Sequence, residues 1–140
     1  MIIKSFVLIG ENGQLLLIRE AAKKWRGKWF LPGGKTLINE SPADTATREV
    51  KEETGYHITL KGIFFIRYTE KFFHGQLSLF YQARISGGKL KTEADKHSLE
   101  AKWFDPDKLR SLPTRQKLSD ILAGFKAGGI LLPENFKVNV

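Results

Sequence analysis

The chain of 140 residues contains no cysteine, which excludes disulfide bonds and metal sites built from thiolates. It also lacks any apolar run near the roughly 18 residues that a membrane-spanning helix needs. The first residues, MIIKSFVLIG, have neither a basic start nor a small-residue cleavage site, so they indicate a first strand rather than a signal peptide. Together these absences favour a location in the reducing cytoplasm.

Acidic residues are the scarcer charged class. Lys and Arg number 23 against 15 Asp and Glu, and the formal net charge of +8 favours anionic partners. The basic residues are spread along the chain in short clusters such as Lys23-Lys24, and no DNA- or RNA-binding motif accompanies them. The pattern therefore favours a small anionic molecule such as a nucleotide as the partner. It predicts neither a dedicated nucleic-acid track nor a membrane contact.

The order of elements predicts a layered α/β domain. No repeat or compositional break divides the sequence, so residues 1–140 are predicted to form a single domain. Two strands joined at Asn12-Gly13 come first. The stretch WFLPGG predicts a short strand broken by Pro32 and two glycines, and two longer strands follow within residues 57–86. A last helix is predicted within residues 114–129. Helices on both sides of these strands indicate a mixed central sheet.

One helix has unusually clear ends in the sequence. Ser41 is a natural N-cap, Pro42 suits the first helical position, and Asp44 lies where it can complete a variant of the capping box. Gly55 supplies the stop. The helix is therefore predicted to run from Pro42 to Thr54.

This helix carries Glu49, Glu52 and Glu53, which are three and four residues apart and so share a patch. Like charges at this spacing repel by a few tenths of a kcal/mol per pair, so either solvent or a cation must balance them. Clustered carboxylates suit Mg²⁺ or Mn²⁺, whereas a solvated surface helix is the alternative. An apolar stripe about a quarter turn away, predicted to pack on the sheet, comprises Ala43, Ala46 and Val50.

The residues before the helix add a longer pattern. Gly33-Gly34 stand at a strand end, where backbone can approach a metal or phosphate. Gly34, five residues, Glu40, seven residues and then REVKEETG with Tyr56 resemble the Nudix box of nucleotide-diphosphate hydrolases, here residues 34–56. Every specified position is met, except that Tyr56 stands where the family usually has an aliphatic residue. The stretches WFLPGGK and WFDPDKL also resemble family features.

The resemblance implies the Nudix α/β/α sandwich with a mixed sheet. It also implies that Mg²⁺, or Mn²⁺ in its place, is bound by Glu49, Glu52, Glu53 and the Gly34 carbonyl. Glu40 and Arg48 are implied to brace the ligand helix. By charge, Arg48 has two possible partners, Asp44 one turn back or a neighbouring carboxylate. Glu49 or Glu52 is expected to accept the proton of the attacking water.

Other site residues follow from the resemblance with several alternatives. In several relatives a glutamate from the loop before the last strand reaches the metals, and the matching offset falls here on His97. Residues near His97 that remain alternatives are Glu93, Asp95 and Glu100. Arg19 is a predicted phosphate contact and Gly33 a predicted substrate contact. Candidate base-stacking residues are Trp25, Phe72 and Phe73, while Trp29 and Trp103 are predicted to pack in the core.

The implied reaction is hydrolysis of a nucleoside diphosphate linked to some group X. The loops around the box resemble the subgroup that cleans up 8-oxo-guanine nucleotides, so an oxidised purine nucleoside di- or triphosphate is favoured, released as monophosphate. The alternatives are an ADP-ribose or nucleotide-sugar pyrophosphatase, and a non-catalytic Nudix module that binds a ligand or RNA. Either a monomer or a homodimer is expected.

Overall fold

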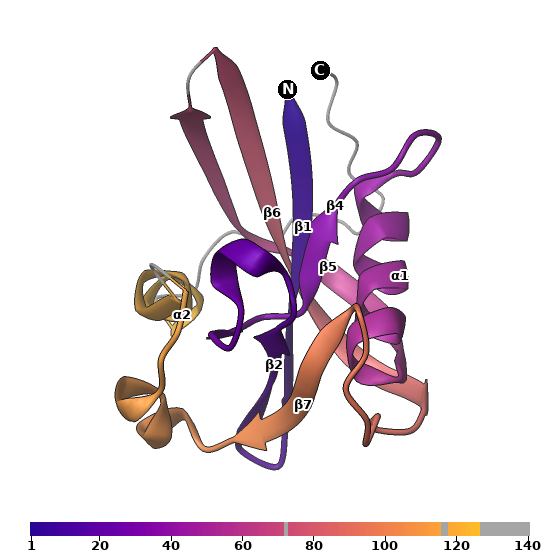
Figure 1. The fold of residues 1–140 in the computed structure, drawn as a ribbon, viewed down its shortest axis with the longest axis vertical. Coiled ribbons are helices and arrows are strands. Elements are labelled where there is room, and N and C mark those ends of the chain that lie inside the picture. The colour runs from indigo at the N-terminus through magenta and orange to yellow at the C-terminus, as the bar shows by residue number, and fades with distance from the viewer. Residues whose placement is uncertain (72, 116–117, 127–140) are drawn as a thin grey trace.

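A computed structural model of the chain describes residues 1–71, 73–115 and 118–126. Its strands are β1 (Ile2–Glu11), β2 (Gln14–Glu20), β3 (Trp29–Phe30), β4 (Gly33–Lys35), β5 (Tyr56–Lys71), β6 (His74–Gly88) and β7 (Ser98–Phe104). They form one seven-stranded sheet in the order β3-β2-β1-β6-β5, with β4 beside β1 and β7 beside β2 (Figure 1). The pairing of β1 with β6 is parallel, and the other named strands pair in antiparallel fashion, so the sheet is mixed.

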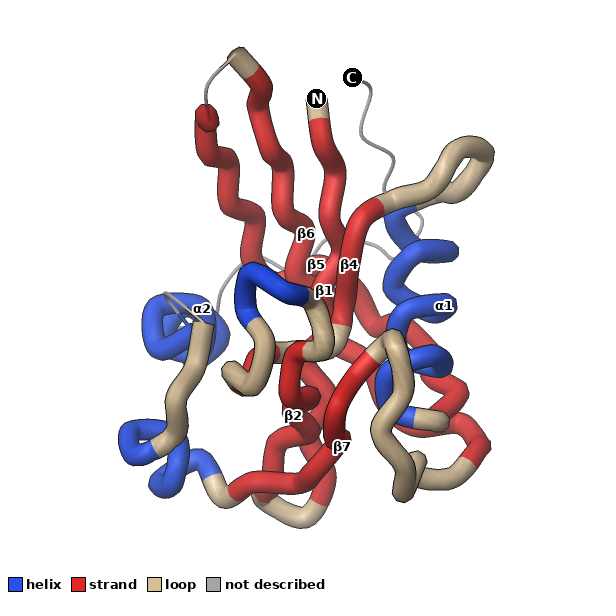
Figure 2. The backbone as a smooth tube through the Cα atoms, in the orientation of Figure 1, coloured by secondary structure: helices blue, strands red, loops and turns tan. Residues whose placement is uncertain are grey.

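Helices cover both faces of this sheet. They are α1 (Pro42–Thr54), α2 (Leu118–Lys126) and the short 3-10 helices η1 (Lys23–Trp25) and η2 (Pro106–Ser111). Figure 2 shows α1 on one side of the strands and α2 on the other. Successive residues of β1 point to opposite faces: Phe6 packs in a core with Ile121 of α2, and Val7 in a second core with Val50 of α1. The predicted α/β/α sandwich is therefore confirmed.

The local signals at the first turn and at α1 are confirmed as well. Asn12 and Gly13 both have positive φ, 52° and 75°, as a tight hairpin between β1 and β2 requires. The Ser41 hydroxyl accepts the Asp44 N–H at 3.0 Å, and the Asp44 carboxylate accepts the Ser41 N–H at 3.1 Å. Gly55 ends α1 with φ 86°, a left-handed conformation that favours glycine.

The predicted break at Pro32 in the stretch WFLPGG is confirmed, but the two glycines, also predicted as part of the break, belong to a second strand. The stretch forms two short strands, because Pro32 has no N–H to continue a ladder. Trp29–Phe30 pairs with β2, and Gly33–Lys35 crosses to pair with β1. The chain thus switches neighbours immediately before the helix that carries the glutamates, which brings Gly33 and Gly34 beside α1.

At the C-terminal end, α2 lies within the stretch predicted to be helical. Residues 116–117 and 127–140 fall outside the described part of the chain, and so does Phe72. Within the described ranges, no helix has both the length and the apolar character to cross a membrane.

Candidate metal centre

Helix α1 presents Glu49 and Glu53 to the glycines of β4. The Glu53 carboxylate accepts a hydrogen bond from the Gly33 N–H at 2.7 Å. The Glu49 carboxylate lies so close to Gly34 that an added Cβ would come within 2.7 Å of the Glu49 Cδ and would overlap its Oε1. A side chain at position 34 would therefore displace the Glu49 carboxylate from its observed place.

Glu53 is the most deeply buried of the three glutamates, with 4% of its surface exposed. It does not belong to the apolar stripe by residue type, but it follows Ala46 by seven residues, or about two helical turns. It therefore points along the same buried line as Ala46. The predicted patch is thus split: Glu53 faces the sheet, while Glu49 and Glu52 lie half-buried at its border.

The surroundings of Glu49 and Glu53 disfavour negative charge on their carboxyl groups. Burial, followed by repulsion from Glu49, raises the pKa of Glu53 well above its ordinary value, and the hydrogen bond from Gly33 opposes the shift. Burial also raises the pKa of Glu49, against the attraction of Arg48. No ion pair to Glu53 is formed within residues 1–71, 73–115 and 118–126. In these described residues the Glu53 carboxylate is therefore balanced only by the N–H of Gly33.

Arg48 provides the positive charge at this border. Its Nε donates to Glu40 Oε2 at 2.6 Å, and its Nη1 lies 3.0 Å from Glu49 Oε1 and 3.1 Å from Glu52 Oε2. Of the two partners considered for Arg48, the neighbouring carboxylates are the ones observed. The other, Asp44, is engaged in the capping box. One guanidinium thus fixes the rotamers of three glutamates.

Glu40 is the anchor of this arrangement. Its carboxylate also accepts the Leu37 N–H at 3.0 Å and the Thr45 hydroxyl at 2.9 Å. The hydrogen bond from Arg48 outweighs desolvation and lowers the pKa of Glu40 to about 2. Glu40 therefore ties the loop before α1 to the guanidinium that orders Glu49 and Glu52.

We expect Glu40→Gln to lower the free energy of unfolding at pH 7 by about 1–2 kcal/mol, because a charge-assisted hydrogen bond is lost from a partly solvated site. The folded pKa of about 2 lies below the ordinary value of 4.5. The stabilisation is therefore complete above about pH 5 and disappears as the pH falls toward 2. Urea unfolding between pH 7 and pH 2.5 should show the two proteins converging at acid pH. The control is Glu93→Gln, on an exposed loop. A difference as large at pH 2.5 as at pH 7 would contradict this account.

The sequence of the chain matches a known protein family. The model of the NUDIX domain matches residues 4–125. The chain belongs to the Nudix family. Human (Homo sapiens) 8-oxo-dGDP phosphatase NUDT18 is 37% identical over 118 residues, which cover 83% of this chain and 35% of that protein. The Nudix chain thus spans about a third of the length of such curated relatives.

Solved structures agree with this assignment. A NUDIX hydrolase from Nitrosomonas europaea matches with a TM-score of 0.80 and 20% identity, covering 98% of this chain and 96% of that one. The MutT protein from Methanosarcina mazei Go1 matches with a TM-score of 0.73 and 27% identity, covering 90% and 93%. These findings confirm the predicted Nudix, MutT-like family. The names of the relatives, a NUDIX hydrolase and an 8-oxo-dGDP phosphatase, agree with the predicted class, a hydrolase acting on phosphoric anhydride bonds.

The donor atoms of the Nudix box suit a hard divalent cation. They are carboxylate oxygens of Glu49, Glu52 and Glu53 together with the backbone of Gly34, and oxygen is the ligand that Mg²⁺ prefers. In the described residues no three His, Asp or Glu side chains are yet grouped as a ready metal cage. Arg48 Nη1 instead lies 3.0 Å from the Glu49 carboxylate and 3.1 Å from the Glu52 carboxylate. The residues fit the ion by the chemistry of their donor atoms.

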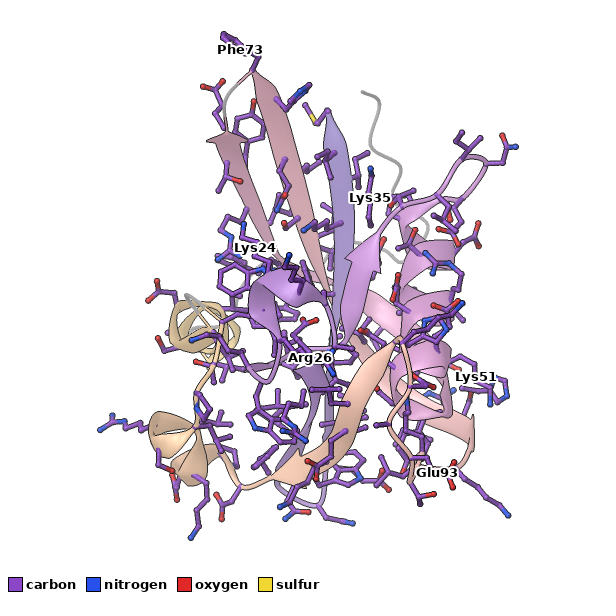
Figure 3. The ribbon with its side chains drawn as sticks, viewed as in Figure 1. Lys24, Arg26, Lys35, Lys51, Phe73 and Glu93 are labelled. Atoms are coloured by element: carbon purple, nitrogen blue, oxygen red, sulfur yellow. The ribbon has the colours of Figure 1, made fainter. Side chains whose placement is uncertain are left out.

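The four candidates for an additional metal ligand differ in their contacts. The Glu100 carboxylate lies 3.6 Å from Arg19, and Asp95 pairs with Lys91 at 2.8 Å. Glu93 is exposed on the loop between β6 and β7, low in the view of Figure 3. His97 Nδ1, in contrast, lies 3.4 Å from Glu52 Oε2. Of the four, His97 is the one whose side chain contacts a Nudix-box carboxylate.

The residues predicted to contact the substrate lie in different surroundings, and only some of them lie near the Nudix box. Gly33 lies at the box, but its N–H already donates to Glu53. Arg19 is held toward Glu100, with its Nε buried and without a hydrogen bond in the described structure. Trp25 lies in η1 with the Arg115 guanidinium 5.0 Å from its ring centroid. Phe73 is fully exposed at the tip of the β5–β6 hairpin, away from α1, so its position gives no support to base stacking (Figure 3).

One ion pair near the site was not predicted from the sequence. Glu20, at the end of β2, accepts a hydrogen bond from Arg115 Nη1 at 3.0 Å, and its charge contributes to the raised pKa of Glu53. The Arg115 guanidinium lies 4.5 Å from the ring centroid of Phe30. The partners are 95 residues apart, and neither belongs to a motif, so no local signal connects them.

Proposed function

We propose that this Nudix domain is a divalent-metal-dependent pyrophosphohydrolase that converts an oxidised purine nucleoside di- or triphosphate to the monophosphate. The observation that carries the metal-dependent reaction is the buried carboxylate of Glu53, which lies beside Glu49 and the backbone of Gly33 and has only an N–H to balance it in the described structure. Similarity to a protein named 8-oxo-dGDP phosphatase supports the substrate class.

Glu49, Glu52, Glu53 and the Gly34 carbonyl are proposed to hold Mg²⁺, with Mn²⁺ as a substitute. When bound, the ion neutralises phosphate oxygens and so favours attack at phosphorus. The surrounding residues set the geometry. Glu40 and Arg48 act as positioning residues, because they contact the carboxylates rather than the reacting atoms.

Glu49 or Glu52 is proposed to take the proton of the attacking water, and each has a carboxylate oxygen in contact with Arg48. A base in this position must be held in place, and the contact with the Arg48 guanidinium orders each carboxylate. Arg19 and Trp25 are kept as proposed contacts to phosphate and base. A cytoplasmic location, and a monomer or homodimer that binds no nucleic acid, stay predictions.

The reaction is tested with a panel of 8-oxo-dGDP, 8-oxo-dGTP, the normal nucleotides, ADP-ribose, UDP-sugars and dinucleoside polyphosphates, each with Mg²⁺ and with EDTA. Released products are identified by mass. We expect the highest kcat/KM for an oxidised guanine nucleotide, release of the monophosphate, and complete loss of turnover in EDTA.

Two other outcomes of the substrate panel would contradict the proposed function. Preference for ADP-ribose or a UDP-sugar would replace the proposed substrate by the alternative pyrophosphatase. Solved structures of an ADP-ribose pyrophosphatase and a UDP-X diphosphatase share the fold with this chain at 21% and 16% identity, which carries no substrate information. Absence of turnover on the whole panel, together with nucleotide binding, would favour a non-catalytic module.

A further inference from the structure

A pocket of about 410 Å³ lies apart from the metal centre, between the β1–β2 hairpin, strands β5 and β6, and the helices η2 and α2. Its apolar lining residues are Leu8, Leu15, Ala83, Pro106, Leu109 and Leu122. Leu8 packs in the core on the α2 side of the sheet, whereas Val50 of the glutamate helix packs in the core on the other side. The described residues that line the pocket include none from the Nudix box. The pocket is therefore a site distinct from the proposed metal centre.

Gly10 leaves space at one wall of this pocket. Its backbone does not adopt the left-handed conformation that favours glycine. The nearest atoms to an added Cβ would be the Gln14 carbonyl oxygen at 3.7 Å and Leu15 Cδ2 at 3.9 Å, which are ordinary van der Waals contacts. Gly55, in contrast, has a φ of 86°. Neither conformation nor crowding requires glycine at position 10, so a side chain placed there would fill part of the pocket.

Two cations stand at the rim of the pocket. In the pairing of β5 with β6, Leu60 lies opposite Ala83 and Gly62 opposite Gln82, so Lys61 is the extra residue of a β-bulge. Bulges redirect side chains out of the regular alternation of a strand.

Lys61 and Arg84 both line the pocket and are exposed. Neither forms an ion pair within residues 1–71, 73–115 and 118–126. Glu11 is the other charged residue of the lining, so two positive charges and one negative charge surround the opening. The rim thus has one positive charge in excess.

We propose that this pocket binds a small carboxylate with an apolar body. Ligand pockets typically have volumes of roughly 300–1,000 Å³, apolar walls and a few polar groups that orient the ligand. The apolar body lies against the leucines, and the carboxylate lies near Lys61 and Arg84. One negative charge balances the rim, whereas the several charges of a nucleoside di- or triphosphate exceed what it offers. The ligand therefore differs in chemical class from the proposed substrate, and the inference does not depend on the proposed function.

A matched pair of probes tests the site on the full chain, labelled with ¹⁵N and free of metal. The probes are 4-phenylbutyrate and 4-phenylbutan-1-ol, which share a body and differ in charge. We expect the acid to bind with a dissociation constant on the order of 1 mM, and to shift the amide signals of Gly10 and Gly13. The alcohol should bind about fivefold more weakly, because exposed charges contribute modestly. Absence of saturable binding of the acid, or equal affinity for the alcohol, would overturn the proposal.

Filling the pocket should abolish binding. We expect Gly10→Leu to weaken binding of the acid at least about tenfold, because its side chain takes the place of the ligand body. Leu109→Trp fills the pocket from η2 and answers the same question if Gly10→Leu does not fold. Folded variants of either kind that bind the acid like the wild type would reject the pocket as the binding site.

Reversing the charges at the rim tests the carboxylate. Lys61→Glu combined with Arg84→Glu should weaken binding of the acid about tenfold and leave binding of the alcohol within about twofold. Lys28→Glu combined with Lys89→Glu makes the same change in net charge at exposed positions outside the pocket lining, and should leave both affinities within about twofold. Equal weakening by the two double variants would show a general effect of net charge and contradict the assigned role of the rim.

Turnover separates this proposal from the proposed function. The rim variants lie away from the Nudix box and should keep the wild-type kcat/KM on the substrate that the panel identifies. Failure of the acid to bind rejects the pocket ligand and leaves the metal-dependent reaction intact. Failure of the substrate panel rejects the reaction and leaves the pocket ligand intact.

Discussion

Turnover falls by about 10²–10⁴-fold when a general base is replaced by its amide, and we expect a loss of this size for Glu49→Gln or Glu52→Gln. The amide keeps the shape of the side chain but cannot accept the proton of the attacking water. Both carboxylates lie about 3 Å from Arg48, so both are ordered and either can perform this role. The measurement is kcat at saturating Mg²⁺ on the substrate that the panel identifies.

The dependence on Mg²⁺ concentration separates the two roles of these glutamates. A variant that has lost a metal ligand recovers turnover as Mg²⁺ is raised, whereas a variant that has lost the base does not. Glu93→Gln removes one carboxylate from an exposed loop and should retain full activity. If Glu49→Gln and Glu52→Gln both keep near wild-type rates at every Mg²⁺ concentration, neither residue is the base.

The sequence predicted α1 well because its signals are local. The N-cap Ser41, the capping-box partner Asp44 and the final Gly55 all act within one helical turn of the residues that they order. The glutamate spacing likewise needs only the helical period. For that reason the helix bounds could be predicted without coordinates, and they agree with the structure.

The rest of the site depends on partners that are distant in sequence. Glu20 meets Arg115 across 95 residues, and Ser98 bonds to the Glu53 carbonyl across 45. Glu53 is buried because it lies about two helical turns after the buried Ala46, on the same face of the helix. The helical period predicts this position, but a charged residue type argues against burial. Of the four candidates for an additional metal ligand, Asp95 and Glu100 form ion pairs with Lys91 and Arg19. Such ion pairs cannot be derived from the spacing of residues in the sequence.

Arg48→Ala is expected to destabilise the protein by about 2–3 kcal/mol at pH 7 without metal, the largest stability effect at this site. The variant leaves the carboxylates of Glu40, Glu49 and Glu52 without their shared guanidinium. Urea unfolding with chelator present measures the loss. Arg48→Lys should recover part of it, because one ammonium cannot reproduce the forked contacts to three glutamates. Lys51→Ala removes the same charge from the exposed face of α1 and should change stability by less than about 0.5 kcal/mol.

The same variant tests whether cation and guanidinium serve the same carboxylates. In the wild type, Arg48 offsets part of the repulsion between Glu49 and Glu52. A bound ion therefore stabilises the wild type less, because less of this repulsion remains. In Arg48→Ala, Mg²⁺ or Mn²⁺ should therefore raise the melting temperature by more than in the wild type, even where turnover is lost. A smaller shift in the variant would mean that Arg48 helps to build the ion site instead of sharing its charge. Stability equal to wild type without metal would show that this guanidinium is not what holds the glutamates in place.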